Sequence, residues 1–407
     1  MIAMAAYLDF AATAPMHPAV KGAIVDALDR IGNPGSIHGH GQRARRALER
    51  ARASVANSLG ADAVEVVFNS GGTEGDNTAI KGLWEARNRG AERPRILTTA
   101  IEHSAILDTV AWLRDHRGAE VVTLPVDHAG VVDLDAFERE LDEHTALVAL
   151  LHANNEIGTV QPVRSICSRA AAAGVPVHID AVASYGQLPI SLHDWGAASV
   201  SVTAHKVGGP VGIGALAIRR GTQMDALIHG GGQQFGFRSG TQDVVGALGF
   251  AAVAELIADP QWLEDHVTLV RQRRDELMRV VHQCAPQAEL TGAKPASVLA
   301  DDGVTGPARL YGNAHFLFPG CQGDSLVYLL DMAGVSVSTG SACQAGIPEA
   351  SHAVIGCGYA SEEALGALRF TVGESTTAEE LALLAQALPD ALERAAKAGF
   401  SSRVVSS

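Results

Sequence analysis

Cysteine is scarce in this chain, and its few cysteines are widely scattered. The 407 residues include five cysteines, an odd number, and no two of them have the Cys-x-x-Cys spacing of a structural zinc site. Such usage is typical of a reducing compartment rather than of a disulfide-stapled fold. We therefore predict a cytoplasmic protein with no disulfide framework and no bound metal. The five are Cys167, Cys284, Cys321, Cys343 and Cys357.

Long apolar runs and excess positive charge are missing as well. The chain has no stretch of about 18 uninterrupted apolar residues, the length needed to span a membrane. Residues 1–10 lack a basic region followed by an apolar run, so we expect no secretory signal. The formal net charge is -14, which makes the chain a poor general ligand for nucleic acid or anionic lipid. We predict neither direct nucleic-acid binding nor membrane association.

Arginine nevertheless gathers in one short stretch, between residues 43 and 52. The spacing is compatible with a helix, and a run of charges on a helix usually forms its solvated face. We interpret the stretch in that way rather than as a binding patch. Its arginines are Arg43, Arg45, Arg46, Arg50 and Arg52.

Short apolar runs rich in β-branched residues alternate with helical patterns over the first two thirds of the chain. Several runs are apolar throughout, as expected for strands that are covered on both faces. This alternation predicts an α/β fold with a mostly parallel, seven-stranded sheet flanked by helices. Ligands of such sheets bind at the carboxyl ends of the strands. The predicted strands are residues 64–68, 95–100, 120–126, 146–153, 175–180, 198–204 and 213–219.

The pattern changes after about residue 260. A charged helix is predicted over residues 261–283, strands become fewer, and an amphipathic helix is predicted over 377–397. We therefore expect a large domain over residues 16–260. Residues 1–15 and 261–407 would form a smaller α+β domain.

Two polar motifs stand where predicted strands end. The run Ser70-Gly71-Gly72-Thr73-Glu74 follows one strand and opens a helix, so its backbone N–H groups could hold a phosphate. A Gly-Gly pair in this place is also a common simple turn. Asp180 ends another strand, where it could pair with a protonated ring nitrogen of a cofactor or merely cap the next helix.

A lysine and a cysteine are the candidate reactive groups. Lys206 ends a third strand and is followed by Gly208-Gly209-Pro210. A buried lysine amine has a lowered pKa and becomes nucleophilic, although the same position could be an exposed loop. Cys343 lies in the small, polar segment Ser338 to Gly346, which suggests a loop with a reactive thiol. The other four cysteines are in apolar or helical settings and are interpreted as structural.

These motifs, in this order, resemble the cysteine desulfurases of the NifS and IscS type, within the class V aminotransferases. The resemblance runs nearly from end to end, and its specificity comes from the order and spacing of many weak motifs. It implies the type I fold of the pyridoxal-phosphate-dependent transferases. The matching segments are residues 7–9, 11–13, 32–38, 70–77, 102–103, 152–158, 205–206, 230–232, 238–241, 341–343 and 368–370, with Asp180.

The resemblance also implies a role for each matching residue. Lys206 would bind pyridoxal 5'-phosphate covalently, Asp180 would pair with its ring nitrogen, and His103 would stack on the ring and relay protons. Asn155 and Arg369 would bind the substrate carboxylate, for which a planar guanidinium is well suited. The phosphate would be held by Gly72, Thr73, Thr203 and His205 of one subunit and by Thr241 of the other, which implies a homodimer.

The implied activity is the conversion of L-cysteine to L-alanine. Cys343 would take the sulfur as a persulfide and pass it to an acceptor protein, either an iron–sulfur scaffold or a tRNA-modifying enzyme. A mobile loop suits this task, because one sulfur atom must visit both the substrate and the acceptor.

Three positions depart from the family pattern. Ala183 stands where the family has a glutamine beside the cofactor's phenolic oxygen, and a lost hydrogen bond of this kind is worth about 1 kcal/mol. Gln234-Phe235 replaces Glu-Arg, and Gly373-Glu374 replaces Gly-Arg or Gly-His. Two alternatives therefore stay open: another class V enzyme, such as a selenocysteine lyase or a transaminase, or a scaffold that keeps the fold without catalysis.

Overall fold

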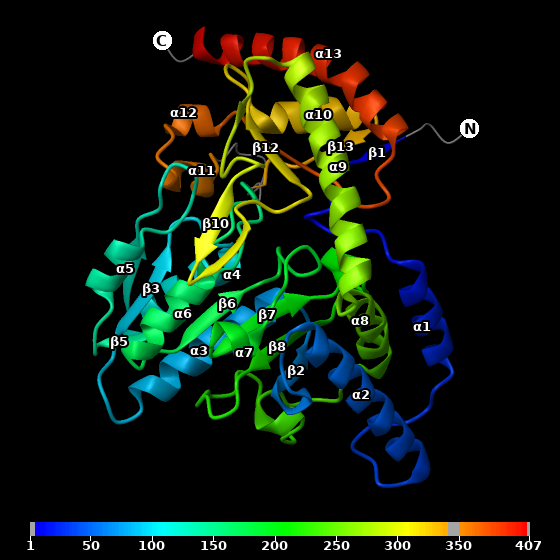
Figure 1. Ribbon diagram of the computed structural model, residues 1–407, viewed down its shortest axis with the longest axis vertical. Helices are drawn as coiled ribbons and strands as arrows, with labels where there is room; N and C mark the ends of the chain where they lie inside the picture. The colour runs from blue at the N-terminus through cyan, green and yellow to red at the C-terminus, as the bar shows by residue number, and fades with distance from the viewer. Residues whose placement is uncertain (1–4, 341–349, 405–407) are drawn as a thin grey trace.

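The computed structural model describes residues 5–340 and 350–404, and the largest element in it is a twisted sheet (Figure 1). The sheet has seven strands, and its order is β2, β8, β7, β6, β5, β3 and β4. Only β8 runs antiparallel to its neighbours. The strands are β2 (Val66–Asn69), β8 (Gly214–Ile218), β7 (Ser199–Thr203), β6 (Val177–Asp180), β5 (Thr145–Leu151), β3 (Arg95–Thr99) and β4 (Glu120–Leu124).

The predicted α/β fold and its mostly parallel, seven-stranded sheet are thus confirmed. Alternate residues of the buried strands face opposite sides, as the period of a strand requires. In β5, Val148 and Leu150 join one hydrophobic core, whereas Leu147 and Ala149 join another. One predicted strand begins late, because residues 63–65 form a short 3-10 helix before β2.

Helices cover both faces of this sheet. Apolar side chains of α3 (Gly72–Asn88) and α4 (Ser104–Arg117) pack on one face. The other face carries α2 (Gly39–Ser58), α5 (Leu134–Glu140), α6 (Val163–Ala172), α7 (Leu192–Trp195) and α8 (Val244–Ile257). Helix α1 (Pro18–Leu28) packs against α8. Three 3-10 helices complete the region: η1 (Ala63–Glu65), η2 (His205–Val207) and η3 (Gln234–Gly236).

A second hydrophobic core lies above the first in Figure 1, and the long helix α9 (Pro260–Cys284) reaches both. It is built around a three-stranded antiparallel sheet and a parallel strand pair that joins the N-terminal residues to residues 335–336. The division at residues 15/16 and 260/261 stays a prediction. The elements are β1 (Ala6–Tyr7), β9 (Glu289–Leu290), β12 (Asn313–Leu317), β13 (Val335–Ser336), β14 (Ala367–Thr371), α10 (Gly323–Met332), α11 (His352–Gly356), α12 (Ser361–Ala364) and α13 (Ala378–Val404).

A β-hairpin ties the two cores together. It consists of β10 (Val298–Asp301) and β11 (Val304–Pro307) and descends towards the large sheet in Figure 1. At its turn, the Asp301 carboxylate accepts hydrogen bonds from the backbone N–H groups of Arg164 (2.9 Å) and Ser165 (2.7 Å). Helix α6 has no side-chain cap from its own N-cap residue, Pro162. Asp301 therefore satisfies N–H groups that the first turn of a helix leaves without partners.

The fold adds two observations that concern the apolar and the arginine-rich segments. No single helix in the described part of the chain is long and apolar enough to cross a membrane, although α8 and α9 meet that criterion jointly, across an 84° bend. The arginine stretch does lie on a helix, α2, but the solvated-face interpretation is wrong for Arg52, which is 2% exposed. Arg52 occupies the inward-facing side of the helix with Leu48 and Val55, four residues before it and three after it.

Candidate active site

A pocket of about 240 Å³ lies at the carboxyl ends of the central strands. This is the edge at which ligands of parallel sheets bind. Eight of the sequence-predicted site residues line it together: Gly72, Thr73, His103, Asn155, Asp180, Thr203, His205 and Lys206. Thr241 does not line it and is exposed. Cys343 lies outside the described residues.

The first turn of α3 forms one end of the pocket. Gly71 has a φ of 147°, and its N–H donates to the Asn69 Oδ1 at 3.0 Å, which turns the chain sharply from β2 into the helix. A Cβ on Gly72 would stand 2.5 Å from the Val182 Cγ2, so only glycine fits there. The helix N-terminus, with the Thr73 side chain, faces the pocket and favours an anion.

Asp180 stands at the end of β6, in the middle of the pocket. It is 6% exposed, and its Oδ1 accepts the Val182 N–H at 2.8 Å. Burial, and next the charge of Asp76, raise the pKa of Asp180 to about 6. Asp180 therefore does cap the following backbone, and it also presents a carboxyl group to the pocket.

His103 is the N-cap of α4 and is positioned by that cap. Its Nδ1 accepts the Ala105 N–H at 3.1 Å, so the neutral ring carries its proton on Nε2. Burial lowers the pKa of His103, the charge of Asp180 acts against this, and Lys206 adds to the lowering. A neutral imidazole in this place can both accept and return a proton.

Lys206 lies in η2, directly after β7, and its side chain points into the pocket rather than to an open loop. Burial lowers its pKa below the usual range; Asp180 opposes this shift, and Arg369 adds to it. Gly208 has a φ of 82°, and a Cβ on Gly209 would lie 2.6 Å from that of Ala204. Both glycines are therefore needed for the tight turn that brings the amine back to the strand end.

Arg369, on β14, does not line the pocket itself, but it contacts Asn155, which does, and its charge acts on Lys206. It is 5% exposed; its Nη2 pairs with the Asp9 Oδ1 at 2.8 Å, and its Nη1 donates to the Asn155 carbonyl at 3.0 Å. Its buried Nε has no hydrogen-bond partner within residues 5–340 and 350–404. The guanidinium is thus held in place with binding capacity left over for an acid.

The described residues on either side of Cys343 contact Arg369 and the sequence neighbours of Asn155 and His103. Ser338 and Arg369 exchange backbone hydrogen bonds. Beyond the undescribed stretch, the Ser351 Oγ donates to the Glu156 Oε2 at 2.6 Å, and the His352 Nε2 lies 2.9 Å from the Glu102 carbonyl oxygen. Both ends of the predicted cysteine segment are therefore anchored beside the pocket.

The four described cysteines lack the features of reactive thiols. Cys167, Cys321 and Cys357 are buried, and Cys284 is partly buried. Burial raises the pKa of every one of them, to about 12 for Cys167 and Cys357. A raised pKa suppresses the thiolate, which is the nucleophilic form.

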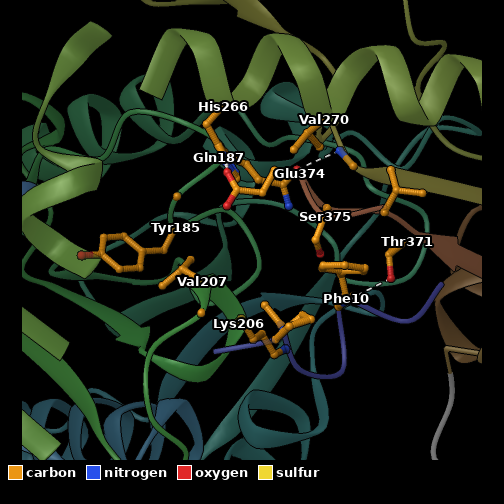
Figure 2. Close-up of a pocket in the computed structure, with 18 of the residues that line it drawn as sticks. Phe10, Tyr185, Gln187, Lys206, Val207, His266, Val270, Thr371, Glu374 and Ser375 are labelled. Carbon is orange, nitrogen blue, oxygen red and sulfur yellow. Dashed lines mark hydrogen bonds and ion pairs between the residues drawn. The ribbon is translucent and has the colours of Figure 1, made fainter. Parts of the chain in front are cut away.

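A second cavity of about 180 Å³ adjoins the pocket at Ala183, and Figure 2 shows residues that line this cavity. Ala183, Asn155 and Lys206 line both spaces. In Figure 2, Lys206 forms one end of the second cavity, and His266 and Glu374 lie at the other. Those two side chains are paired at 3.0 Å. Two departures from the family pattern, the short side chain of Ala183 and the acidic side chain of Glu374, thus line the same cavity.

Gln234 and Phe235 have a structural explanation. The Gln234 amide exchanges hydrogen bonds with both backbone groups of Phe68 in β2 and accepts one from the Arg52 Nη1 at 3.0 Å. The Arg52 guanidinium lies over the rings of Phe68 and Phe235, 5.2 and 5.3 Å from their centroids. Gln234 and Phe235 therefore connect helix α2 to the edge strand β2 through Arg52 and Phe68. This structural role gives no support to a loss of catalysis.

Sequence reasoning missed two acids of the site. Asp9 holds Arg369, and its signal was the Tyr7-Leu8-Asp9 motif, which marked the family but suggested no role. Asp76 lines the pocket from α3 and is 1% exposed. Nothing local in the sequence distinguishes it from a solvated helix residue.

Comparison with known proteins gives a consistent result. The Aminotransferase class-V family model matches residues 6–384. An IscS-like cysteine desulfurase of Mycobacterium tuberculosis is 43% identical over 399 residues, which cover 97% of this chain and 98% of that protein. The cysteine desulfurase IscS of Dictyoglomus turgidum is 38% identical, with 92% and 91% covered.

Solved structures agree. A NifS-like protein superposes with a TM-score of 0.85 at 32% identity, covering 96% of this chain and all (100%) of that one. SspA in complex with cysteine superposes with a TM-score of 0.76 at 28% identity, covering 91% and 100%. The cysteine desulfurase of Thermococcus onnurineus, at 21% identity and a TM-score of 0.79 over 96% and 95% of the two chains, shares the fold.

Proposed function

Because the chain belongs to the aminotransferase class-V family, and by its relatives to the cysteine desulfurases within it, we propose that it converts L-cysteine to L-alanine with pyridoxal phosphate bound at Lys206. One observation carries the proposal. The amine of Lys206, the carboxyl of Asp180 and the N-terminus of α3 line a single pocket at the strand ends. These are the groups that such a cofactor needs for its carbonyl carbon, its ring nitrogen and its phosphate.

The pocket fits the cofactor in three further respects. The space beside Gly72 would be filled by any side chain, so the backbone can approach a phosphate closely there. Thr203 and His205 line the same pocket. His103, held by its cap on α4, supplies a flat ring for one face of the cofactor. When bound, pyridoxal phosphate supplies an electron-withdrawing ring that accepts the electron pair left at the substrate's Cα.

The protein's own residues bind the substrate and move its protons. Arg369 and Asn155 orient the carboxylate of L-cysteine. The Lys206 amine, whose pKa is lowered by burial, takes the Cα proton and returns it later in the cycle. The Cys343 thiolate attacks the substrate sulfur; the carbon–sulfur bond breaks, and Cys343 keeps the sulfur as a persulfide while L-alanine leaves. The contacts of Ser338 with Arg369 and of Ser351 with Glu156 support this role, because they place the residues on either side of that segment next to the substrate-binding residues.

A homodimer and an acceptor protein complete the proposal. Thr241 does not line the pocket of its own chain and is exposed, which supports its reaching the phosphate of a partner subunit. We place the enzyme in the cytoplasm, where reduced thiols persist. Its acceptor is an iron–sulfur scaffold or a tRNA-modifying enzyme, either of which would take the sulfur from Cys343.

Incubation with L-cysteine tests the proposal. We expect alanine to form, and Cys343 to gain the mass of one sulfur atom. The Cys343→Ala variant should lose both signals, whereas Cys284→Ala, which removes a partly buried thiol, should keep them. Alanine formation that survives Cys343→Ala would favour another class V reaction. A chain that binds no pyridoxal phosphate would contradict the proposal altogether.

A further inference from the structure

A buried acid that the proposed chemistry does not use faces the cofactor pocket. Asp76 lies in the second turn of α3, is 1% exposed and lines the pocket together with Asp180 and Lys206. Helix α3 therefore contributes both the anion-binding N-terminus, at Gly72, and a carboxyl group one turn further on. Buried acids without a partner are rare because the charged form is costly away from water.

The partner of Asp76 is a histidine that is completely buried. The His178 Nε2 lies 3.1 Å from the Asp76 Oδ1, and its Nδ1 lies 2.9 Å from the Ser199 Oγ. His178 is 0% exposed, and burial lowers its pKa to about 4, so its ring is neutral. His178 and Asp180 are two residues apart on β6 and so face the same side of the sheet. Asp76 is thus held in the same pocket as Asp180 and close enough for its charge to act on Asp180.

Too many acids lie in this pocket or close to it for all of them to be ionised. Burial raises the pKa of Asp76 to about 7 and that of Glu102 to about 8, and Asp76 and Asp180 each raise the pKa of Glu102 further. Closely spaced carboxylates cannot all carry charge in a buried site. The titratable groups facing Asp76 from the adjacent segments are Glu102, His103, His178, Asp180 and Lys206.

The geometry decides which carboxyl stays ionised. Asp180 accepts a backbone N–H at 2.8 Å and lies beside His103 and the Lys206 amine, all of which favour a negative charge. The Ser201 hydroxyl and the Lys206 charge also favour the charged form of Asp76, but burial outweighs them. The ring partner of Asp76 is the neutral, buried imidazole of His178, to which a protonated carboxyl can donate through its O–H. A neutral acid–imidazole pair avoids the cost of burying two charges.

We propose that Asp76 is a positioning residue for Asp180: held by His178, it keeps its proton, so that the pocket offers a single carboxylate, at Asp180, to the ring nitrogen of the cofactor. The proposal rests on the proposed function for its purpose. Its physical content, a protonated acid close to an ionised one, belongs to the protein alone and can be measured before any cofactor is added.

Infrared spectroscopy of the full chain without pyridoxal phosphate tests that content. At about pH 6, below the range in which the raised pKa would release the proton, the carbonyl band of protonated carboxyl groups should be weaker in Asp76→Asn than in the wild type. Glu85→Gln, an exchange on the exposed side of the same helix, should leave the band unchanged. An Asp76→Asn band equal to that of the wild type would overturn the proposal.

The pH dependence of thermal unfolding supplies a second measurement that does not depend on spectral assignment. A buried acid with a raised pKa stabilises the fold below the pKa of the unfolded chain, and this contribution is lost as the pH rises through the folded pKa. Between about pH 5 and about pH 8, the melting temperature should therefore fall more in the wild type and in Glu85→Gln than in Asp76→Asn. Parallel curves for all three proteins would contradict the proposal.

Added pyridoxal phosphate then tests whether Asp76 acts through Asp180. Asp180→Asn removes the charge that would pair with the ring and should weaken cofactor binding, at about pH 7, about tenfold more than Asp76→Asn does. Equal losses in the two variants would overturn the assignment of the charge to Asp180. If no protein binds the cofactor, the proposed function fails, while the infrared and unfolding results still decide the protonation of Asp76.

Discussion

The pocket has two walls that are built in different ways. The cofactor wall, formed by Gly72, Asp76, Asp180 and Lys206, comes from successive strand ends and the helix between them. The substrate wall consists of Asn155, which lines the pocket, of Arg369, which donates to the Asn155 carbonyl, and of Asp9, which pairs with Arg369. Its contacts join residues that are 214 and 360 positions apart in the chain. Backbone geometry fixes the first wall, whereas side chains from distant segments must meet to form the second.

The two walls also differ in what sets the properties of their side chains. On the cofactor wall, burial dominates: it lowers the pKa of Lys206 and raises the pKa values of Asp76 and Asp180. On the substrate wall, a nearly buried guanidinium is matched to acids and carbonyl oxygens by direct contacts. Substitutions on the first wall should therefore change chemistry and proton transfer, and those on the second should change substrate binding.

The largest effect is expected for Lys206→Ala on the cofactor wall. Removal of the amine abolishes covalent attachment and the base that takes the Cα proton in the proposed cycle. Alanine formation should fall by about a thousandfold or more. Lys21→Ala, which removes an exposed lysine, should retain the wild-type rate. Loss of less than about tenfold in Lys206→Ala would show that this wall does not carry the chemistry.

Arg369→Lys should have a smaller effect and a different signature. Lysine keeps the positive charge but lacks the planar guanidinium, whose several N–H groups can contact Asp9, the Asn155 carbonyl and a substrate carboxylate at the same time. The KM for L-cysteine should rise by about 10-fold to 100-fold, while the absorbance of the bound cofactor should stay that of the wild type. Arg394→Lys, in an exposed helical pair, is the matched control. An altered cofactor spectrum would show that the two walls are not separate.

Glu102→Gln should change how the free energy of unfolding depends on pH, by an amount on the order of a few kcal/mol. Glu102 is 1% exposed, and its oxygens accept hydrogen bonds from the Thr99 hydroxyl and the Leu151 N–H, both at 2.6 Å. Burial raises its pKa from 4.5 to about 8. The proton it holds thus stabilises the fold at pH values below the unfolded pKa, and this stabilisation is lost as the pH rises towards the folded one.

The free energy of unfolding of the wild type should therefore decline between about pH 5 and about pH 8, by an amount on the order of a few kcal/mol. Glu102→Gln, which cannot ionise, should show a flatter profile in denaturant titrations across that range. Glu92→Gln, at an exposed position, should follow the wild type. A wild-type profile that is already flat would mean that Glu102 is ionised in the folded protein.

The two walls also differ in how far the sequence predicts them. Lys206, Asp180 and Gly72 all follow predicted strand ends, which meet at one edge of a parallel sheet, and the family resemblance then decided between the alternatives that each motif had left open. The contact of Asp9 with Arg369 could not be predicted, because no local sequence pattern indicates a pair of residues 360 positions apart. All seven strands were predicted, because several of their apolar runs are continuous and helical patterns separate most of them.

Buried charges are where sequence reasoning failed. Arg52 was assigned to a solvated face with its neighbours, although Leu48 and Val55 already marked the inward side of that helix. Asp76 was overlooked for a similar reason, because a charged residue on a helix is usually exposed. In both cases a distant partner, Gln234 or His178, compensates the burial, and the sequence does not reveal that pairing.

The smallest effect is expected at the contact between the β10–β11 hairpin and helix α6. Asp301→Ala removes both acceptors that cap α6 and should lower the free energy of unfolding by about 1 kcal/mol. Asp302→Asn, at the neighbouring exposed position with a φ of 46°, should be neutral, since asparagine tolerates that conformation. Denaturant titration of the two variants gives the comparison.

Alanine formation should barely change in Asp301→Ala, because a second connection holds the substrate wall. The buried Arg309 guanidinium donates to the carbonyl groups of Thr291 and Ala293 and to both oxygens of Asn313, and the Asn313 side-chain amide donates to the Glu156 carbonyl, next to Asn155. That network fixes the loop carrying Asn155 independently of the hairpin turn. A KM increase in Asp301→Ala as large as that in Arg369→Lys would instead show that the hairpin itself positions the substrate wall.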